Sequence, residues 1–350
     1  MNDPNSGVDA VNHLQGAKLD GDWTVLEKIQ KPENGTGGHF SVCYQVEHKS
    51  GKRAFLKALN LGKALNMPGD TLRQIESLIK TFNFERETLE LCRAKKMRRI
   101  ATPLADGKLQ PLGSAYPVYY IIFDLADGDI RKKFSNFASI DLAWVLRTLH
   151  QTAAALGELH TDGIAHQDLK PSNVLVYGSR ETKVSDLGCA HTRTNGSPRG
   201  HLHVAGDKSY APPELLYHEI ALDREWERRR LGCDLYLFGS MVVFLFTGTS
   251  INSVIFSKLG QPHRPGFWPQ DYRTVLPFVR DAFGKAIREI ATGIPEAVRP
   301  EIISVVEELC DPEPEHRGDL GNPSGNQFSV ERYVSLFNRL AARAEFGLFE

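Results

Sequence analysis

Runs of apolar residues alternate with polar turns over the first part of this chain, in a pattern typical of a β-sheet. Three strand-like runs follow one another at residues 23–29, 40–46 and 54–57, and a Gly-containing turn separates each from the next. A further β-branched and aromatic run occupies residues 119–123. Strands that succeed one another through turns predict an antiparallel meander.

Apolar residues three to four positions apart predict helices. From Leu72 to Phe82 this spacing indicates an amphipathic helix, which residues 84–91 continue after a break expected near Asn83. Two more helices are expected, a long one capped by Asp141 and a final one that begins at Ser329.

Two short apolar runs, residues 174–176 and the strand ending at Val184, flank a Gly-containing turn and predict a hairpin. Polar side chains lie at its open end, where its two flanking loops meet. Carboxylate and amide oxygens hold Mg²⁺ on phosphates, a separate carboxylate orients an attacking hydroxyl, and a lysine neutralises the moving phosphoryl group. The residues with this chemistry are Asp168, Lys170, Asn173 and Asp186.

A polar hairpin mouth would explain any one of these residues, but not their order. The order His-x-Asp-x-Lys-x-x-Asn, hairpin, Asp-x-Gly resembles the catalytic and metal-binding loops of the eukaryotic-type protein kinases. The run Asp-Leu-Lys-Pro-Ser-Asn at 168–173 is similar to the serine/threonine branch of that family. Motifs in the family's order extend over residues 22–320.

This resemblance implies a two-lobed α+β fold forming a single kinase domain, with ATP in the cleft between the lobes. The small N-lobe, an antiparallel β-sheet plus a helix, would span residues 21–125, and the larger, mainly helical C-lobe would span residues 126–350. Residues 1–20 are expected to form a mobile N-terminal tail.

The resemblance also implies transfer of the γ-phosphoryl group of Mg-ATP to serine or threonine hydroxyls of a protein substrate. Asp168 would orient the hydroxyl and accept its proton, and Lys170 would stabilise the charge. Asn173 and Asp186 would hold the metal, two Mg²⁺ ions with Mn²⁺ as a substitute.

Phosphate binding would fall to the N-lobe. Lys57 resembles the strand lysine that holds the α- and β-phosphates, and Glu87 resembles its helix partner, with Glu85 and Glu90 close by. A Gly-rich turn is the candidate phosphate loop, because glycines let backbone N–H groups approach phosphate oxygens, although such a turn alone is usually only a hairpin. Its glycines are Gly35, Gly37 and Gly38; only Gly38 matches a family glycine, and Thr36 and Ser41 stand where the other two are expected.

Residues around the end of the 119–123 strand would bind the base and the sugar. By resemblance, Phe123 would lie behind the adenine, and backbone groups from Asp124 to Ala126 would hydrogen-bond to it. Asp129 has two readings of equal weight, contact with the ribose or capping of a helix.

Residues 189–208 are polar and lack periodicity, which predicts a flexible loop. By resemblance this is the activation segment, which ends at Glu214. Asp207 occupies the position where the family usually has a threonine that touches the catalytic aspartate. Asp234 would hold the catalytic loop, and Arg317 would pair with Glu214.

Gln167 precedes the catalytic aspartate, where many family members have an arginine that binds a phosphate on the activation segment. A neutral amide cannot supply that charge-assisted pairing. We therefore expect a kinase that does not need phosphorylation of this segment.

Composition excludes several classes of protein. A formal net charge of −1 gives no general attraction to nucleic acid or to an acidic membrane, and the basic runs 93–99 and 228–230 are interpreted as solvated helix faces. Five scattered cysteines without a Cys-x-x-Cys pair fit a reducing compartment. The polar N-terminus lacks a signal-peptide core, and the most apolar run, 241–246, is too short to span a bilayer. We expect a cytoplasmic protein with no nucleic-acid or membrane partner; its oligomeric state stays open.

Two other functions are consistent with parts of the sequence. The eroded glycine loop and Asp207 would suit a pseudokinase scaffold or binding module with weak or no catalysis, but every charged catalytic residue is retained. Phosphorylation of a small molecule is opposed by the long segment 189–214, which resembles a platform for a protein substrate.

Overall fold

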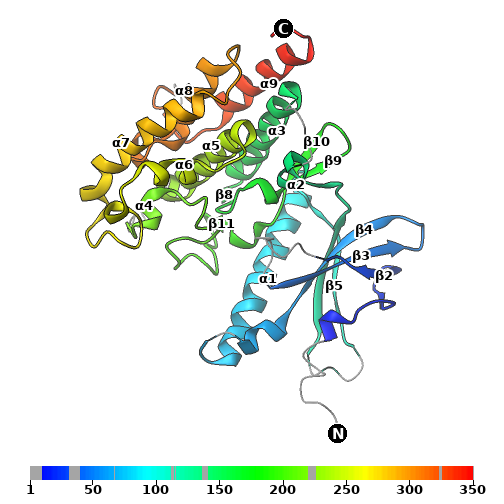
Figure 1. The fold of residues 1–350 in the computed structure, drawn as a ribbon. Helices are drawn as coiled ribbons and strands as arrows, with labels where there is room; N and C mark the ends of the chain where they lie inside the picture. Colours follow the sequence, from blue (N-terminus) through cyan, green and yellow to red (C-terminus); the bar gives the residue numbers. More distant parts are fainter. Residues whose placement is uncertain are drawn as a thin grey trace. The chain divides into compact units, whose positions relative to one another are not determined.

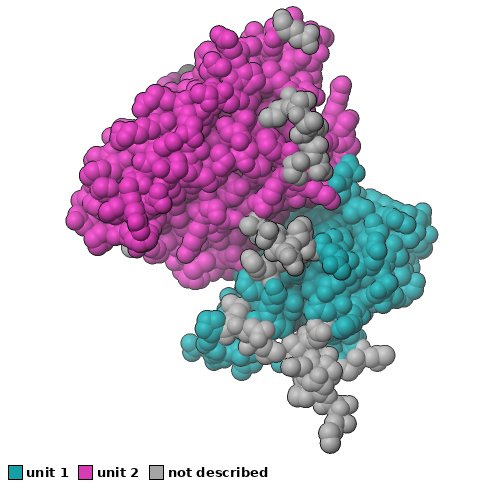
Figure 2. All heavy atoms as spheres, in the orientation of Figure 1, with its two compact units in different colours: residues 1–127 teal, residues 128–350 magenta. Residues whose placement is uncertain are grey.

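The computed structural model describes residues 10–30, 40–66, 68–111, 114, 116–135, 141–219, 226–322 and 325–349. The chain forms two compact units, unit 1 (Met1–Asp127) and unit 2 (Gly128–Glu350), coloured separately in Figure 2. The division falls two residues beyond the boundary expected from the sequence.

Unit 1 contains a six-stranded sheet in the order β1-β2-β3-β4-β6-β5, in which every neighbouring pair is antiparallel. The predicted meander and the strand at 119–123 are confirmed. Tyr44, Leu56 and Ile122 lie opposite one another on three neighbouring strands, so their side chains point to the same face of the sheet. All three are fully buried on that face. The strands are β1 (Lys18–Leu19), β2 (Trp23–Lys28), β3 (Ser41–His48), β4 (Arg53–Leu59), β5 (Pro103–Leu109) and β6 (Val118–Asp124).

One continuous helix, α1 (Thr71–Ala94), follows a short 3₁₀ helix at Leu61–Asn66. The Asp70 carboxylate caps α1 by accepting from the Leu72 N–H at 2.9 Å. The break expected near Asn83 is wrong. A single Asn inside a helix costs at most about 0.7 kcal/mol in propensity, and burial of apolar residues on both sides of it, such as Phe82 and Leu89, offsets that cost.

Residues 10–20 belong to the folded unit, so the expectation of a mobile tail up to residue 20 is wrong for this part. Val11, Leu14 and Leu19 are buried in the same core as the sheet. The hydroxyl of Tyr44 donates to the Val11 carbonyl oxygen at 2.7 Å and anchors the segment to β3. Burial of these apolar side chains and the hydrogen bonds of the segment oppose the entropy lost when it is ordered.

Unit 2 is mainly helical and is centred on α5, in which residues 232–246 are all buried. Helix α9 runs along α3 (Figure 1), and Nδ1 of His150 lies 3.1 Å from the carbonyl oxygen of Val334. The helices predicted after Asp141 and near Ser329 are confirmed; the second begins two residues later than expected. The helices are α2 (Ile130–Ser135), α3 (Leu142–Thr161), α4 (Pro213–Leu216), α5 (Gly232–Thr247), α6 (Ile251–Lys258), α7 (Tyr272–Ala291), α8 (Arg299–Cys310) and α9 (Glu331–Glu345).

Short strands in unit 2 position the polar loops. The predicted hairpin is confirmed as β9 (Val174–Tyr177) and β10 (Glu181–Val184), which are antiparallel, and β7 (Gly128–Asp129) pairs with β9. β8 (Ile164–Ala165) pairs with β11 (His191–Thr192).

Among the described residues, one helical stretch, Glu227–Thr247, has the length and apolar composition of a membrane span. Of its most apolar 18-residue window, 94% is buried inside the protein. The apolar stretch is thus longer than the 241–246 run suggests, and its burial is that of a core helix.

Candidate active site

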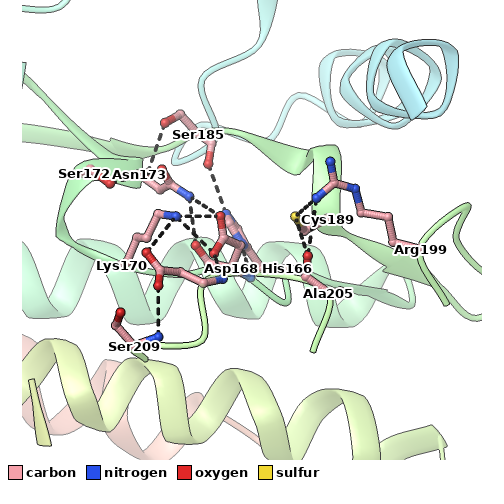
Figure 3. A network of polar contacts seen from close by, with 11 residues as sticks. His166, Asp168, Lys170, Ser172, Asn173, Ser185, Cys189, Arg199, Ala205 and Ser209 are labelled. Atoms are coloured by element: carbon pink, nitrogen blue, oxygen red, sulfur yellow. Dashed lines mark hydrogen bonds and ion pairs between the residues drawn. The ribbon is translucent and has the colours of Figure 1, made fainter. Parts of the chain in front are cut away.

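The loop between β8 and β9 brings Asp168, Lys170 and Asn173 together, and their side chains point toward one another (Figure 3). Lys170 Nζ lies 3.0 Å from Asp168 Oδ2, and Asn173 Nδ2 donates to the same oxygen at 3.1 Å. Asn173 Nδ2 also donates to the Asp168 carbonyl at 2.8 Å, which closes the loop on itself. All three side chains are buried, so their mutual geometry is fixed by packing as well as by hydrogen bonds.

The electrostatic setting of this group favours proton transfer. Burial raises the pKa of Asp168, and the negative charge of Asp186 adds to the effect, although Lys170 opposes both. Burial would lower the pKa of Lys170, but the Asp168 carboxylate outweighs it and the pKa is raised. Asp168 is thus a stronger base than an exposed carboxylate, beside a lysine that stays charged.

Asp186 follows β10 directly after Ser185, and hydrogen bonds join this loop to the catalytic loop. The Ser185 N–H donates to the Asn173 carbonyl at 2.8 Å, and His166 Nε2 lies 3.1 Å from the Ser185 carbonyl. Asp186 adopts a left-handed backbone with φ 65°, an uncommon conformation for a non-glycine residue and a frequent one at functional sites. The residues predicted as metal ligands, Asn173 and Asp186, therefore sit on two loops that are bonded to each other.

Their chemistry fits a hard divalent cation. Asn173 turns its amide nitrogen to Asp168, so its Oδ1, which has a long 3.5 Å contact with the Ser172 hydroxyl, would be the atom that binds a metal. An amide oxygen and a carboxylate are ligands that Mg²⁺ prefers, with phosphates and water completing the shell.

Asp234, in α5, anchors the catalytic loop through hydrogen bonds to its backbone. Its carboxylate accepts from the backbone N–H groups of His166 at 2.7 Å and Gln167 at 2.8 Å, and lies 2.9 Å from His160 Nε2. Burial would raise the pKa of Asp234, but the hydrogen bond from His160 and the other donors outweigh it and lower the pKa. This anchor supports the left-handed conformation of Gln167, whose φ is 65°.

The activation segment is more ordered than its sequence suggested, which corrects the expectation of a flexible loop. It begins with β11 paired to β8, and Arg199 then reaches the Cys189 sulfur at 3.3 Å (Figure 3). At Gly206 the backbone touches the catalytic loop so closely that a Cβ there would lie 2.5 Å from Asp168 Oδ1. Only glycine can come this close to Asp168, and the next residue, Asp207, therefore lies beside the catalytic loop.

Arg230 contacts the catalytic loop and the activation segment, and the sequence did not predict this role. It is buried, which contradicts the solvated helix face predicted for 228–230. Its guanidinium donates to Gln167 Oε1 and to the Gly200 carbonyl, both at 3.2 Å, and so joins the catalytic loop to the activation segment. A signal was available, because Arg230 lies four residues before Asp234 and therefore on the same side of a helix.

At the end of the segment, the pair predicted for Glu214 and Arg317 is present. Arg317 Nη1 and Nη2 donate to the two carboxylate oxygens at 2.9 and 3.1 Å, in a bidentate arrangement. Burial would lower the pKa of Arg317, but Glu214 outweighs it and raises the pKa.

In unit 1, Lys57 on β4 pairs with Glu85 on α1, with Nζ 2.6 Å from Oε1. The predicted Lys57–Glu87 pair is wrong, because Glu87 is exposed and lies beside Arg86 instead. The helical period could have predicted the correct partner. Glu85 is three residues after buried Phe82 and four before buried Leu89, so it lies on the same face of the helix.

The remaining nucleotide-site candidates differ in how well the structure describes them. Gly35, Gly37 and Gly38 lie outside the described residues. Phe123 is partly buried opposite Phe55, Ala126 is partly buried, and the Asp124 side chain pairs with Lys52 at 2.7 Å. Asp129 caps α2 by accepting from the Lys132 N–H at 2.9 Å, as the second of its two readings proposed.

A family model for the protein kinase domain matches residues 31–320. The chain belongs to the protein kinase family. Its match to that model covers both the Lys57–Glu85 pair and the catalytic loop. Members of this family use ATP and divalent metal ions in general.

Curated relatives of this kinase are distant. The serine/threonine-protein kinase ppk23 of Schizosaccharomyces pombe is 26% identical over 266 residues, which cover 73% of this chain and 59% of that protein. CBL-interacting protein kinase 12 of Oryza sativa is 24% identical over 266 residues, which cover 74% of this chain and 45% of the relative. The chain thus spans about half the length of these relatives.

Proposed function

We propose that this kinase transfers the γ-phosphoryl group of Mg-ATP to serine or threonine hydroxyls of a protein substrate. The observation that carries the proposal is the buried group of Asp168, Lys170 and Asn173, bonded through Ser185 to the loop that bears Asp186. These side chains supply a base, a cation and two oxygen ligands within one pair of loops. Serine and threonine are favoured because both relatives are kinases and one carries that description in its name.

Asp168 acts on the acceptor hydroxyl. The Asp207 N–H and Asn173 Nδ2 hold its two carboxylate oxygens in place, so the carboxylate presents a fixed acceptor to the hydroxyl proton. Its raised pKa favours taking up that proton as the new phosphate ester forms. Lys170 stays charged and stabilises the negative charge on the transferred group.

Asn173 and Asp186 would hold the metal, and Lys57 would bind the phosphates. Bound Mg²⁺ supplies charge neutralisation of the phosphate oxygens, in addition to the lysines. The Glu85 carboxylate pairs with the Lys57 ammonium and would hold it in position for phosphate binding. Two Mg²⁺ ions, with Mn²⁺ as an alternative, are the metals that we propose for these oxygen ligands.

The test is incubation of the purified chain with labelled ATP and Mg²⁺, with and without a generic protein substrate. Wild type should label the substrate, and Asp168→Asn should not. Asp281→Asn on α7, an exposed carboxylate that pairs with Lys285, is the matched control and should label like wild type. A pseudokinase scaffold would show binding of ATP with no labelling by any of the three proteins.

A further inference from the structure

Asp207 adds a third charged side chain to Asp168 and Lys170. Its backbone N–H donates to Asp168 Oδ1 at 2.7 Å, and its own Oδ2 lies 3.5 Å from Lys170 Nζ. The Ser209 N–H donates to Asp207 Oδ1 at 2.9 Å and fixes the side chain. Among the described residues, Lys170 is the cation that pairs with this carboxylate.

One ammonium group therefore serves two carboxylates. Lys170 Nζ is 3.0 Å from Asp168 and 3.5 Å from Asp207, so one negative charge stays unbalanced when both acids are ionised. Burial would raise the pKa of Asp207, but the Ser209 N–H and Lys170 outweigh it and lower the pKa. Asp207 is thus ionised at neutral pH.

The position of Asp207 is set by its neighbour and not by its own side chain. Gly206 touches Asp168 and the Gln167 carbonyl, where a Cβ would lie 2.5 Å from each. This close backbone contact brings residue 207 beside the catalytic carboxylate whatever its side chain. The Asp207 carboxylate therefore adds a negative charge beside Asp168, where the acceptor hydroxyl would bind. Of its side-chain surface, 15% is exposed.

We propose that Asp207 is a specificity-determining residue, which selects serine or threonine hydroxyls that have a lysine or arginine next to them. The inference rests on the proposed function. When Lys170 turns to the transferred phosphoryl group, Asp207 loses its cation, and a basic side chain of the bound segment takes that place. An acidic or phosphorylated neighbour of the hydroxyl meets two carboxylates and is rejected.

The experiment measures kcat/KM for three peptides that share one serine and differ only in the residue beside it, which is arginine, glutamine or glutamate. Wild type should prefer arginine to glutamine by roughly fivefold, and glutamine to glutamate by a similar factor, as expected for a partly exposed ion pair. In Asp207→Asn both ratios should fall to within about twofold. Because each ratio is taken within one enzyme, a general loss of rate cancels.

Two controls identify the charge that acts. Asp281→Asn changes the net charge equally and should keep the wild-type ratios, because it lies on α7 and pairs with Lys285. Raising the salt to about 1 M, where the screening length is about 3 Å, should weaken the preference of wild type.

Equal use of all three peptides by wild type would overturn this inference and leave the proposed function standing. A preference that persists in Asp207→Asn would also overturn it, by assigning the selection to another acid. Failure of wild type to phosphorylate any peptide or the generic protein would overturn both.

Discussion

The Lys57–Glu85 ion pair shows how much depends on one carboxylate in unit 1. The two side chains are 18% and 7% exposed, so water screens their interaction weakly. Loss of the Glu85 carboxylate removes a charged partner of Lys57 in a sheltered site, where an ion pair is costly to break. The lysine would then no longer be held in the direction that phosphate binding requires.

Glu85→Gln should therefore lower kcat/KM for ATP by at least about tenfold, because the neutral amide cannot hold Lys57 by charge. Glu87→Gln is the matched control on the same helix and should stay within about twofold of wild type, since Glu87 is exposed. Steady-state kinetics with a fixed protein substrate decides between them. A larger loss of kcat/KM in Glu87→Gln than in Glu85→Gln would instead indicate that Glu87 is the partner of Lys57.

Among elements, the activation segment depends on contacts that need no phosphate. Arg230 bonds both Gln167 and Gly200, and β11 pairs with β8. Thr192 is buried and bonded to Gly196, which leaves Thr194 as an exposed hydroxyl and Ser197 as a partly exposed one. We therefore expect the buried Arg230 guanidinium to hold the segment in place of a phosphate bound to an arginine.

A Thr194→Ala, Ser197→Ala double variant and phosphatase-treated wild type should both keep transfer to an exogenous substrate within a few-fold of untreated protein. Arg230→Met should lower transfer by at least about tenfold, because the Gln167 and Gly200 oxygens lose a charged donor. Arg288→Met, an exposed change on α7, is the control for loss of a positive charge. A collapse of the double variant would show that phosphorylation is required.

The sequence predicts elements better than it predicts side-chain partners. The β9–β10 hairpin and the α3 helix follow from local turn and cap residues, so their prediction needs only neighbours in the chain. The Arg230 contact with Gln167 joins residues 63 positions apart, and no local pattern names such a partner. The Asp207 contact with Asp168, over 39 positions, was expected only through the resemblance to the kinase family. Local charge also misleads, as at 228–230, because a basic run is usually solvated.

At the scale of the molecule, the buried Glu214–Arg317 pair ties the end of the activation segment to the loop after α8 in unit 2. All three guanidinium nitrogens are bonded, Nη1 and Nη2 to Glu214 and Nε to the Asp311 carbonyl. A further bond joins Nη1 to the Gly232 carbonyl at 3.2 Å, at the start of α5. The pair therefore links the end of the activation segment to the helical core of this unit.

Arg317→Met should destabilise the protein by about 3–5 kcal/mol, because Glu214 would be left buried without its cation. The double variant with Glu214→Met should recover part of this loss, since no uncompensated charge remains. Urea unfolding followed by circular dichroism measures both. A double variant less stable than Arg317→Met would contradict the explanation.

We expect Asp168 to act on the hydroxyl and Asp186 to hold the metal, and a paired binding and transfer measurement tests these two roles. Titration of a non-hydrolysable ATP analogue, with and without Mg²⁺, is combined with labelled transfer for Asp168→Asn and Asp186→Ala. Asp168→Asn should keep Mg²⁺-dependent binding and lose transfer by at least about a hundredfold, the range for a general base. Asp186→Ala should lose both transfer and the effect of Mg²⁺ on binding. Near-native transfer by both variants would contradict the account.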